Sequence, residues 1–187
     1  GNCFTIAASN IVLDGAGYSI IGNGSGIAIY SSTYSNITVQ NFAGINNFTQ
    51  GIDAEDGGSV FIVNNNTFTT AADIGDEYYI ELITNHTLIQ NNIFNGISTN
   101  SDSEVIGVLD PSYNSTIFNN TFNLSGGTYG ISHESSFGGN ITGNNFTSSS
   151  STVAISLVSN VQNTTYITSN IVTTTGNNGG GISIIGN

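Results

Sequence analysis

Short apolar stretches return at a nearly constant interval along the chain. One column of large apolar residues, spaced 24 to 28 residues apart, consists of Tyr18, Phe42, Phe68, Phe94, Phe122, Phe146 and Val172. An aliphatic residue stands five positions before each of them, at Leu13, Ile37, Val63, Ile89, Ile117, Ile141 and Ile167. Equivalent residues at one spacing predict a solenoid, because stacked coils bury such residues as continuous columns.

A third apolar column, usually preceded by Gly, follows later in each repeat: Ile27, Ile52, Ile80, Val108, Ile131, Ile155 and Ile182. The apolar stretches are short, rich in β-branched residues and interrupted by Asn, Gly, Ser and Thr, which is typical of strands and not of helical repeats. The pattern predicts an all-β fold, a single-stranded right-handed parallel β-helix of about seven turns with a period of about 26 residues. We expect residues 1–187 to form a single domain.

A mostly polar column lies two positions before the first apolar column. Its members are Ala16, Gln40, Asn66, Asn92, Asn120, Asn144 and Asn170. Asn tolerates the left-handed conformation of a sharp corner, and its side chain can bond to an equivalent Asn in the next coil. The column therefore predicts a stacked Asn ladder at one corner of the solenoid.

The segments that carry this pattern resemble a known class of proteins. The opening FTIAASNIVLDGAGYSIIGNGSGIAIYSSTYSNITVQNF is similar to parallel β-helix repeat proteins of the pectin-lyase-like class, especially the Asn- and Thr-rich type of archaeal and bacterial cell surfaces. The resemblance extends over nearly the whole chain. It implies the fold, but that fold carries lyases, hydrolases, epimerases, adhesins and scaffolds, so function has to be argued from residues.

The charge balance limits the partners. The chain has no Lys and no Arg, twelve acidic residues and a net charge of −12. Without cations to neutralise phosphates, nucleic acid and anionic membranes are poor partners. The sequence contains no run of 18 consecutive apolar residues, so it predicts no membrane-spanning segment. The start at Gly1 fits a processed product or an excised segment, and we expect an extracellular, cell-surface location.

Sequons are frequent and agree with that location. Asn-x-Ser/Thr occurs at Asn23, Asn36, Asn47, Asn65, Asn85, Asn114, Asn119, Asn123, Asn140, Asn145 and Asn163. We expect several of them to carry glycans. Because side chains alternate along a strand, Asn36 and Asn140, beside the inward Ile37 and Ile141, should point outward.

Acidic residues gather on one side when the coils are aligned by the third apolar column. The alignment brings Asp53, Glu81 and Asp110 together, with His133 and Glu134 beyond them. Stacked carboxylates repel, so such a column is a solvated face, a calcium site or an acid/base pair like that of a glycoside hydrolase. Calcium held by Asp53, Glu81 and Asp110 is the only cofactor that the sequence indicates.

Catalysis is not expected. Resemblance to the polysaccharide lyases of this fold would imply an Arg or Lys against the substrate, and the related hydrolases carry Gly-His-Gly and a basic clamp; the chain has none of these. We therefore expect no enzyme activity and no catalytic residues. A carbohydrate-binding module is the alternative, with exposed rings expected among Tyr30, Tyr34, Tyr78, Tyr79, Tyr113 and Tyr129.

Both ends of the sequence carry apolar strands without a capping segment. The residues expected at the end faces are Cys3, Phe4 and Ile6, and then Ile182, Ile184 and Ile185. Cys3 is either a small buried residue or an intermolecular link. Unpaired strand edges favour self-association. The sequence thus predicts a structural or adhesive subunit of a cell-surface layer, sheath or fibre that polymerises end to end.

Overall fold

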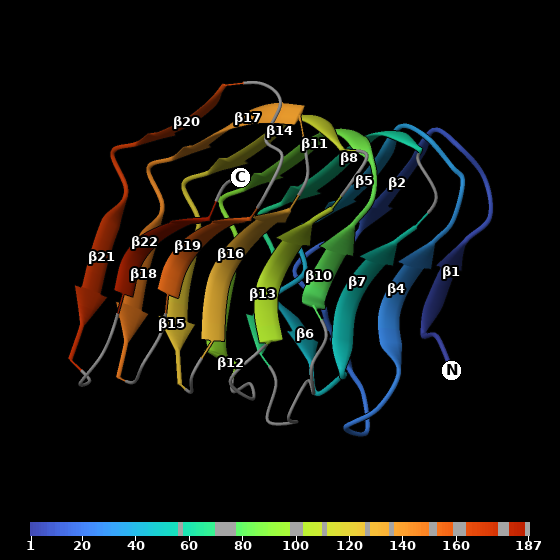
Figure 1. Ribbon diagram of the computed structural model, residues 1–187. Coiled ribbons are helices and arrows are strands. Elements are labelled where there is room, and N and C mark those ends of the chain that lie inside the picture. Colours follow the sequence, from blue (N-terminus) through green and yellow to red (C-terminus); the bar gives the residue numbers. More distant parts are fainter. Residues whose placement is uncertain are drawn as a thin grey trace.

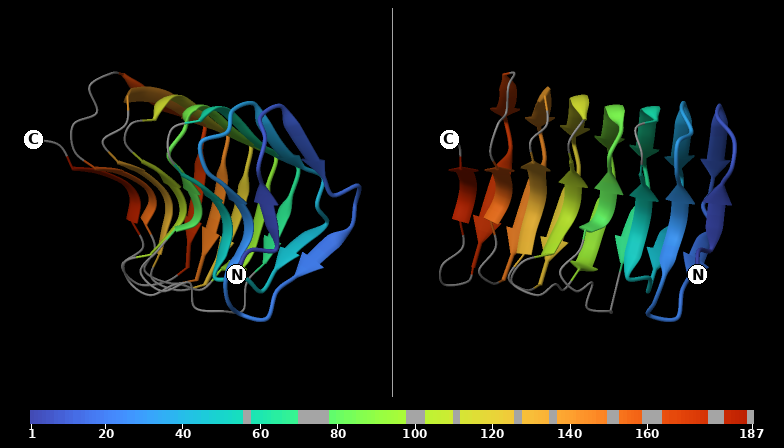
Figure 2. Two further views of the ribbon diagram at one scale, coloured as in Figure 1. Left: turned by 90° about the vertical axis from the view of Figure 1, so that its right-hand side faces the viewer. Right: turned by 45° about the vertical axis from the view of Figure 1, so that its right-hand side comes forward.

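The computed structural model describes residues 1–55, 58–69, 78–97, 103–109, 112–125, 128–134, 137–149, 153–158, 164–175 and 180–185. These residues form 22 strands and no helix. Successive strands come in threes, one in each of three parallel sheets, and β22 adds an eighth strand to the first sheet. The chain is therefore a parallel β-solenoid, as the periodicity predicts. Successive coils stack next to one another along a single axis (Figure 1; Figure 2, right).

We name the sheets A, B and C. Sheet A contains β1 (Phe4–Ile6), β4 (Ile27–Ser31), β7 (Gln50–Ala54), β10 (Tyr78–Leu82), β13 (Ser103–Val108), β16 (Thr128–Glu134), β19 (Val153–Val158) and β22 (Gly180–Ile185). Sheet B contains β2 (Ile11–Asp14), β5 (Ile37–Gln40), β8 (Ser59–Asn64), β11 (Asn85–Gln90), β14 (Tyr113–Phe118), β17 (Phe137–Thr142) and β20 (Thr165–Thr168). Sheet C contains β3 (Ser19–Ile21), β6 (Gly44–Asn46), β9 (Thr67–Thr69), β12 (Ile93–Ile97), β15 (Thr121–Leu124), β18 (Asn145–Ser148) and β21 (Ile171–Thr174).

The aliphatic columns fill the interior, with two corrections of register. In sheet B, Val39 and not Ile37 pairs with Leu13 and Val63. In sheet A the column runs through Ile29, Ile52, Ile80, Ile106, Ile131 and Ile155, so Ile27 and Val108 were each placed two residues away from the true member. Residues two apart on a strand face the same side, so the apolar pattern alone does not distinguish them.

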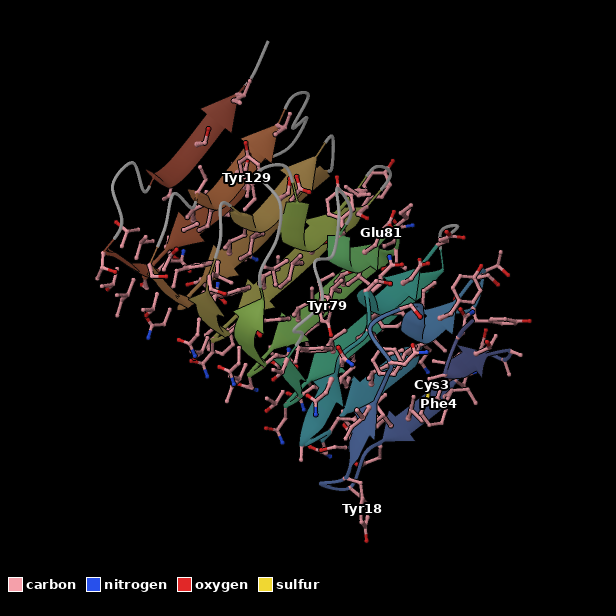
Figure 3. All side chains as sticks on the ribbon, turned by 90° about the horizontal axis from the view of Figure 1, so that it is seen from below. Cys3, Phe4, Tyr18, Tyr79, Glu81 and Tyr129 are labelled. Carbon is pink, nitrogen blue, oxygen red and sulfur yellow. The ribbon has the colours of Figure 1, made fainter. Side chains whose placement is uncertain are left out.

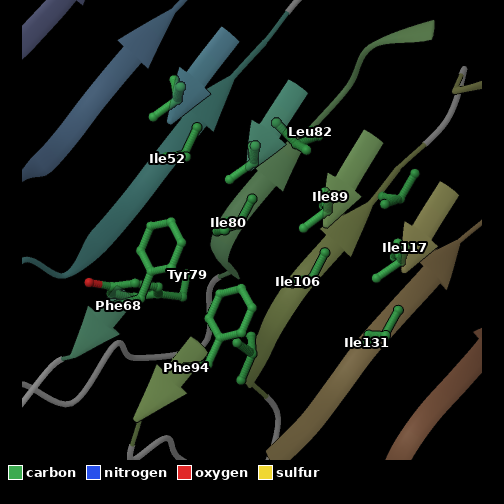
Figure 4. Close-up of a cluster of buried hydrophobic side chains, with 14 of the residues drawn as sticks. Ile52, Phe68, Tyr79, Ile80, Leu82, Ile89, Phe94, Ile106, Ile117 and Ile131 are labelled. Carbon is green, nitrogen blue, oxygen red and sulfur yellow. The ribbon is translucent and has the colours of Figure 1, made fainter. Parts of the chain in front are cut away.

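Aromatic rings stack along the interior of sheet C. Phe68, Phe94, Phe122 and Phe146 are buried, with centroids 5.0, 4.8 and 4.4 Å apart and nearly parallel planes. Tyr79 meets the ring of Phe68 edge-on, and its hydroxyl donates to the Ile45 carbonyl at 3.3 Å. Figure 4 shows Phe68, Phe94 and Tyr79 together with the buried isoleucines of sheets A and B. The stack thus occupies the four middle coils, since Ile20 and Ile45 precede it in register and Val172 follows it.

The first two coils depart from the predicted aromatic column. Ile20 and Ile45 precede Phe68 in register, so the assignment of Tyr18 and Phe42 to that column is wrong. Tyr18 is 77% exposed. The backbone carbonyls of Tyr18 and Phe42 each accept a hydrogen bond from a backbone N–H of the following coil. The carbonyl of Asn66, at the corner of the third coil, accepts the equivalent bond. Both residues thus occupy the corner before sheet C, because these coils contain extra residues around it.

The predicted Asn ladder exists, and it is made of two adjacent columns. The inner column, Asn66, Asn92, Asn120 and Asn144, is at most 2% exposed. Each Oδ1 accepts from the backbone N–H of the preceding coil at 2.9–3.0 Å, and each Nδ2 donates to a backbone carbonyl of that coil. The left-handed residue at the corner is the exposed one that precedes the inner Asn: Asn65, Asn91 and Asn119, with φ of 53–57°.

One histidine lies inside the solenoid. His133 of β16 continues the inward column of Leu82 and Val108, followed by Leu157, and it is 1% exposed. The expectation that His133 joins the acidic outer side is therefore wrong. Burial lowers the pKa of His133 to about 4, because the apolar interior disfavours the imidazolium.

His133 makes the stability of the fold depend on pH. Unfolded His titrates near pH 6.5, so between about pH 6.5 and 4 the unfolded chain binds more protons than the folded one. Above pH 6.5 the imidazole of His133 does not change the free energy of unfolding. As the pH falls from 6.5 toward 4, protonation of the unfolded chain lowers the free energy of unfolding by about 3 kcal/mol in total. Chemical denaturation at a series of pH values measures the slope. We expect His133→Leu to flatten the curve in this window; a slope unchanged by this substitution would contradict the role of His133.

Candidate functional site: the outer face of sheet A

Polar and aromatic side chains gather on the outer face of sheet A, where the candidate acidic residues lie. Because side chains alternate along a strand, the residues that follow the inward Ile column point outward. This outer column contains Tyr30, Asp53, Glu81, Gly107 and Ser132, paired in register from strand to strand. The sequence alignment of Asp53 with Glu81 is thereby confirmed. Adjacent strands lie about 4.8 Å apart, so the two carboxylates are direct neighbours.

Hydrogen bonds hold the carboxylates of this face in place. Nε2 of Gln50 donates to Oε2 of Glu81 at 3.1 Å, and the Tyr30 hydroxyl donates to Oε2 of Glu55 at 3.2 Å. Asp53 is only 4% exposed, and Ser132 only 1%. The face is therefore a crowded polar surface, largely shielded from solvent, and it differs from the open solvated surface that its charge alone would indicate.

Tyrosine rings occupy the neighbouring outer column. Tyr78, Glu104 and Tyr129 are paired in register on β10, β13 and β16. The ring of Tyr78 packs over Gly107, where any Cβ would collide with it. Glu81 and Tyr129 lie along this one sheet in Figure 3. Acidic, amide and aromatic groups thus alternate on a single face, an arrangement that suits a polyhydroxyl ligand or a cation.

The calcium site stays a prediction. Asp53 and Glu81 are adjacent, and Asp110 lies outside the described residues. Within the described ranges, no three His, Cys, Asp or Glu side chains come close enough together to hold a metal ion. The candidate rings differ among themselves: Tyr113 is 39% exposed, whereas Tyr79 is fully buried and is wrong as a ligand contact.

The predicted glycosylation sites differ in exposure. Asn23, Asn36, Asn65, Asn114, Asn119, Asn123, Asn140 and Asn145 are exposed, Asn47 and Asn85 are half-buried, and Asn163 lies outside the described residues. Asn36 and Asn140 point outward beside the buried Ile37 and Ile141, as expected. The side chains of Asn36, Asn65, Asn119 and Asn123 donate to Asn Oδ1 atoms of neighbouring coils at 2.8–2.9 Å. Asn114, Asn140 and Asn145 donate to no other group among the described residues, so they are the least encumbered acceptors.

The predicted end-face residues are placed at the two end coils. Cys3 is exposed, Phe4 is 38% exposed and Ile6 is buried at 6%. At the other end Ile182, Ile184 and Ile185 are 51%, 72% and 59% exposed. The buried alternative for Cys3 is therefore wrong for this coil, while Phe4 and the three isoleucines lie on the surface. Figure 3 shows Cys3 and Phe4 at the same end as Tyr18.

Sequence analysis missed Tyr166, an exposed ring on β20. It is 59% exposed and pairs in register with Asn140. The signal was present, because Tyr166 directly precedes the inward Ile167, and strand alternation places it outside. It was read only as part of a strand of the repeat.

Comparison with protein-family models, with curated proteins and with solved structures finds no match at all to this chain. None of the described residues belongs to a helix long and apolar enough to cross a membrane. The parallel β-solenoid is therefore established from the structure itself, and the resemblance to the pectin-lyase-like class remains an expectation about its type.

Proposed function

We propose that this solenoid is a structural or adhesive subunit of an extracellular layer, sheath or fibre, and that it polymerises by stacking the end coils of neighbouring copies. The observation that carries the proposal is that apolar side chains of the first and last described strands are exposed, among them Phe4, Ile182 and Ile184. A stacked copy would extend the inward apolar columns and pair the edge strands, which is β-augmentation.

The exposed isoleucines at β22 define what a further coil would bury. Ile155 and Leu157 of β19 are 0% and 7% exposed because β22 covers them. Ile182 and Ile184, their partners in register, are 51% and 72% exposed. A further coil would bring both residues to the interior environment, at about 1.5–3 kcal/mol for each fully buried side chain.

The opposite end offers an apolar receiving surface. A hollow of about 320 Å³ lies against the first coil, lined by Phe4, Thr5, Ile6, Ala7, Ala8, Ile11 and Leu13. The two end coils lie at opposite ends of the stack (Figure 2, right). Contact between unlike ends does not close on itself, so it extends into a filament. The absence of Lys and Arg leaves no positive charges to repel one another at this contact.

A single substitution at the end face tests the proposal. We expect Ile184→Lys to abolish concentration-dependent assembly, measured by sedimentation velocity, because it would place a charge in an apolar column. The matched control is Val12→Lys: Val12 is 63% exposed, but it points outward from sheet B. The control should assemble like the unchanged protein. An unchanged protein that stays monomeric at high concentration, or an Ile184→Lys protein that still assembles, refutes end-to-end stacking.

A further inference from the structure

A hollow of about 380 Å³ lies on the outer face of sheet B, away from the acidic face of sheet A, and it extends to β20, the last strand of sheet B. It lies over the three neighbouring strands β14, β17 and β20. Its lining side chains are uncharged and include a single aromatic ring: Asn114, Thr116, Asn140, Thr164 and Tyr166. The remaining lining residues are the glycines Gly138 and Gly139.

Both glycines line the floor of the hollow. Gly138 has φ 71°, in the left-handed region that favours glycine. At Gly139 a Cβ would collide with the carbonyl oxygen of Ser115 on the adjacent strand, so no larger residue fits. That Cβ position faces the interior, 3.5 Å from Nε2 of the buried His133, so Gly138 is the residue whose missing side chain leaves bare backbone beneath the hollow. The side chains of the flanking strands then stand as walls around it.

The walls present a ring, an amide and a hydroxyl in a row. Thr116, Asn140 and Tyr166 are paired in register, so they follow one another at about 4.8 Å. Tyr166 is 59% exposed. Within the part of the chain that the structure describes, the side chains of Asn114, Asn140 and Tyr166 make no hydrogen bond or ring contact. Their polar groups are therefore available to a ligand.

These groups match the chemistry of a neutral sugar. A pyranose has an apolar face of C–H groups, which packs on an aromatic ring, and hydroxyls at its edge, which bond to amides and hydroxyls. A concave site with few polar groups at fixed positions is the usual form of a small-ligand site. Anionic sugars are disfavoured, because the chain has net charge −12 and no Lys or Arg. We propose that this hollow binds one neutral pyranose residue, with its face on Tyr166 and its hydroxyls at Asn114, Asn140 and Thr116.

Two sources could supply that sugar. Asn114 and Asn140 each begin an Asn-x-Thr sequon, so a glycan attached to either one would place its own first sugars beside Tyr166. Alternatively, the sugar belongs to a separate polysaccharide. The recognition chemistry is the same in both cases, and the proposal is independent of whether the solenoid polymerises.

The binding test uses the full chain produced without glycosylation and titrated with oligomers of N-acetylglucosamine and of glucose, followed by calorimetry and ligand-observed NMR. We expect saturable binding of a neutral oligomer, and about tenfold weaker binding after Tyr166→Ala, from the loss of ring stacking. Tyr18→Ala, which removes an exposed ring outside the hollow, should bind like the unchanged protein. A galacturonate oligomer should not bind. Absence of saturable binding by every neutral oligomer, or equal binding by the Tyr166→Ala protein, overturns the proposal.

The second arm identifies the source of the sugar. The same chain is secreted from an N-glycosylating host, and its glycopeptides are mapped. If the attached glycan fills the hollow, Asn114 or Asn140 carries sugar, added oligomers no longer bind, and glycosidase treatment restores binding. If the ligand is a separate polysaccharide, glycosylated protein binds the oligomers as well as unglycosylated protein does. Both results support a sugar site. Glycosylated protein that fails to bind while Asn114 and Asn140 are unmodified contradicts it.

Discussion

Asn120→Ala is expected to lower the free energy of unfolding by about 3–6 kcal/mol, because it leaves several buried polar groups without partners. Oδ1 of Asn120 accepts from the backbone N–H and the side-chain Nδ2 of Asn92 at 2.9 and 3.1 Å. Its Nδ2 donates to the carbonyl of Ile89 at 3.0 Å and to Oδ1 of Asn144 at 3.0 Å. Urea denaturation followed by circular dichroism measures the loss.

The preceding residue supplies the control for this substitution. Asn119 is exposed, adopts φ 53° and donates one side-chain bond to Asn91. We expect Asn119→Ala to cost only about 1–2 kcal/mol, from strain at the left-handed residue and one lost solvent-exposed bond. Equal losses at the two positions would contradict the assignment of the inner column as the main polar support of the corner.

Ile117→Asp is expected to prevent folding altogether. Ile117 is fully buried in the central column of sheet B, between Ile89 and Ile141. The substitution removes about 1.5–3 kcal/mol of apolar burial. It also buries an unpaired carboxyl, which costs about 2–7 kcal/mol even when the group is neutral. Together these losses approach the whole stability of a typical domain. Circular dichroism and limited proteolysis of the purified protein report the result.

The adjacent position tests whether the effect depends on the side of the strand. Phe118 is 42% exposed and points outward from the same strand. Phe118→Asp is expected to leave the circular dichroism signal of the β-sheets intact. It should lower the free energy of unfolding by about 1 kcal/mol, which shifts the melting temperature by only a few degrees. A folded Ile117→Asp protein would mean that the register of sheet B is wrong.

Apolar periodicity was enough to predict the parallel β-solenoid and its repeat, because the columns of Ile, Val and Phe recur at one spacing. It was not enough to fix register. Ile37 and Val39 both face inward, so a shift of two residues leaves the pattern unchanged, and only the strand pairing distinguishes them. The same limit explains the misplaced Ile27. The assignment of Tyr18 and Phe42 to the aromatic column failed for another reason. The first two coils contain extra residues around the corner, so both residues lie before sheet C and outside that column.

The candidate sites were less predictable than the fold, because they depend on the direction of individual side chains and on where glycine falls in the register of the sheets. Aligning Asp53 with Glu81 required only the repeat. His133 was placed with the acidic residues, although strand alternation puts it two positions after the inward Ile131 and therefore inside. The hollow beside Tyr166 depends on Gly138 lying on the strand between β14 and β20, which follows from register and not from any local motif.

Electron microscopy of the concentrated, unmodified protein tests end-to-end stacking most directly. Sheet A contributes eight strands per copy, from β1 to β22. At about 4.8 Å per strand, stacking on β22 predicts unbranched fibres of a single solenoid width with an axial repeat of about 38 Å, and a 4.8 Å reflection along the fibre axis. Uniform single particles one solenoid long at every concentration, or sheets joined only along their sides, would contradict the stacking of end coils.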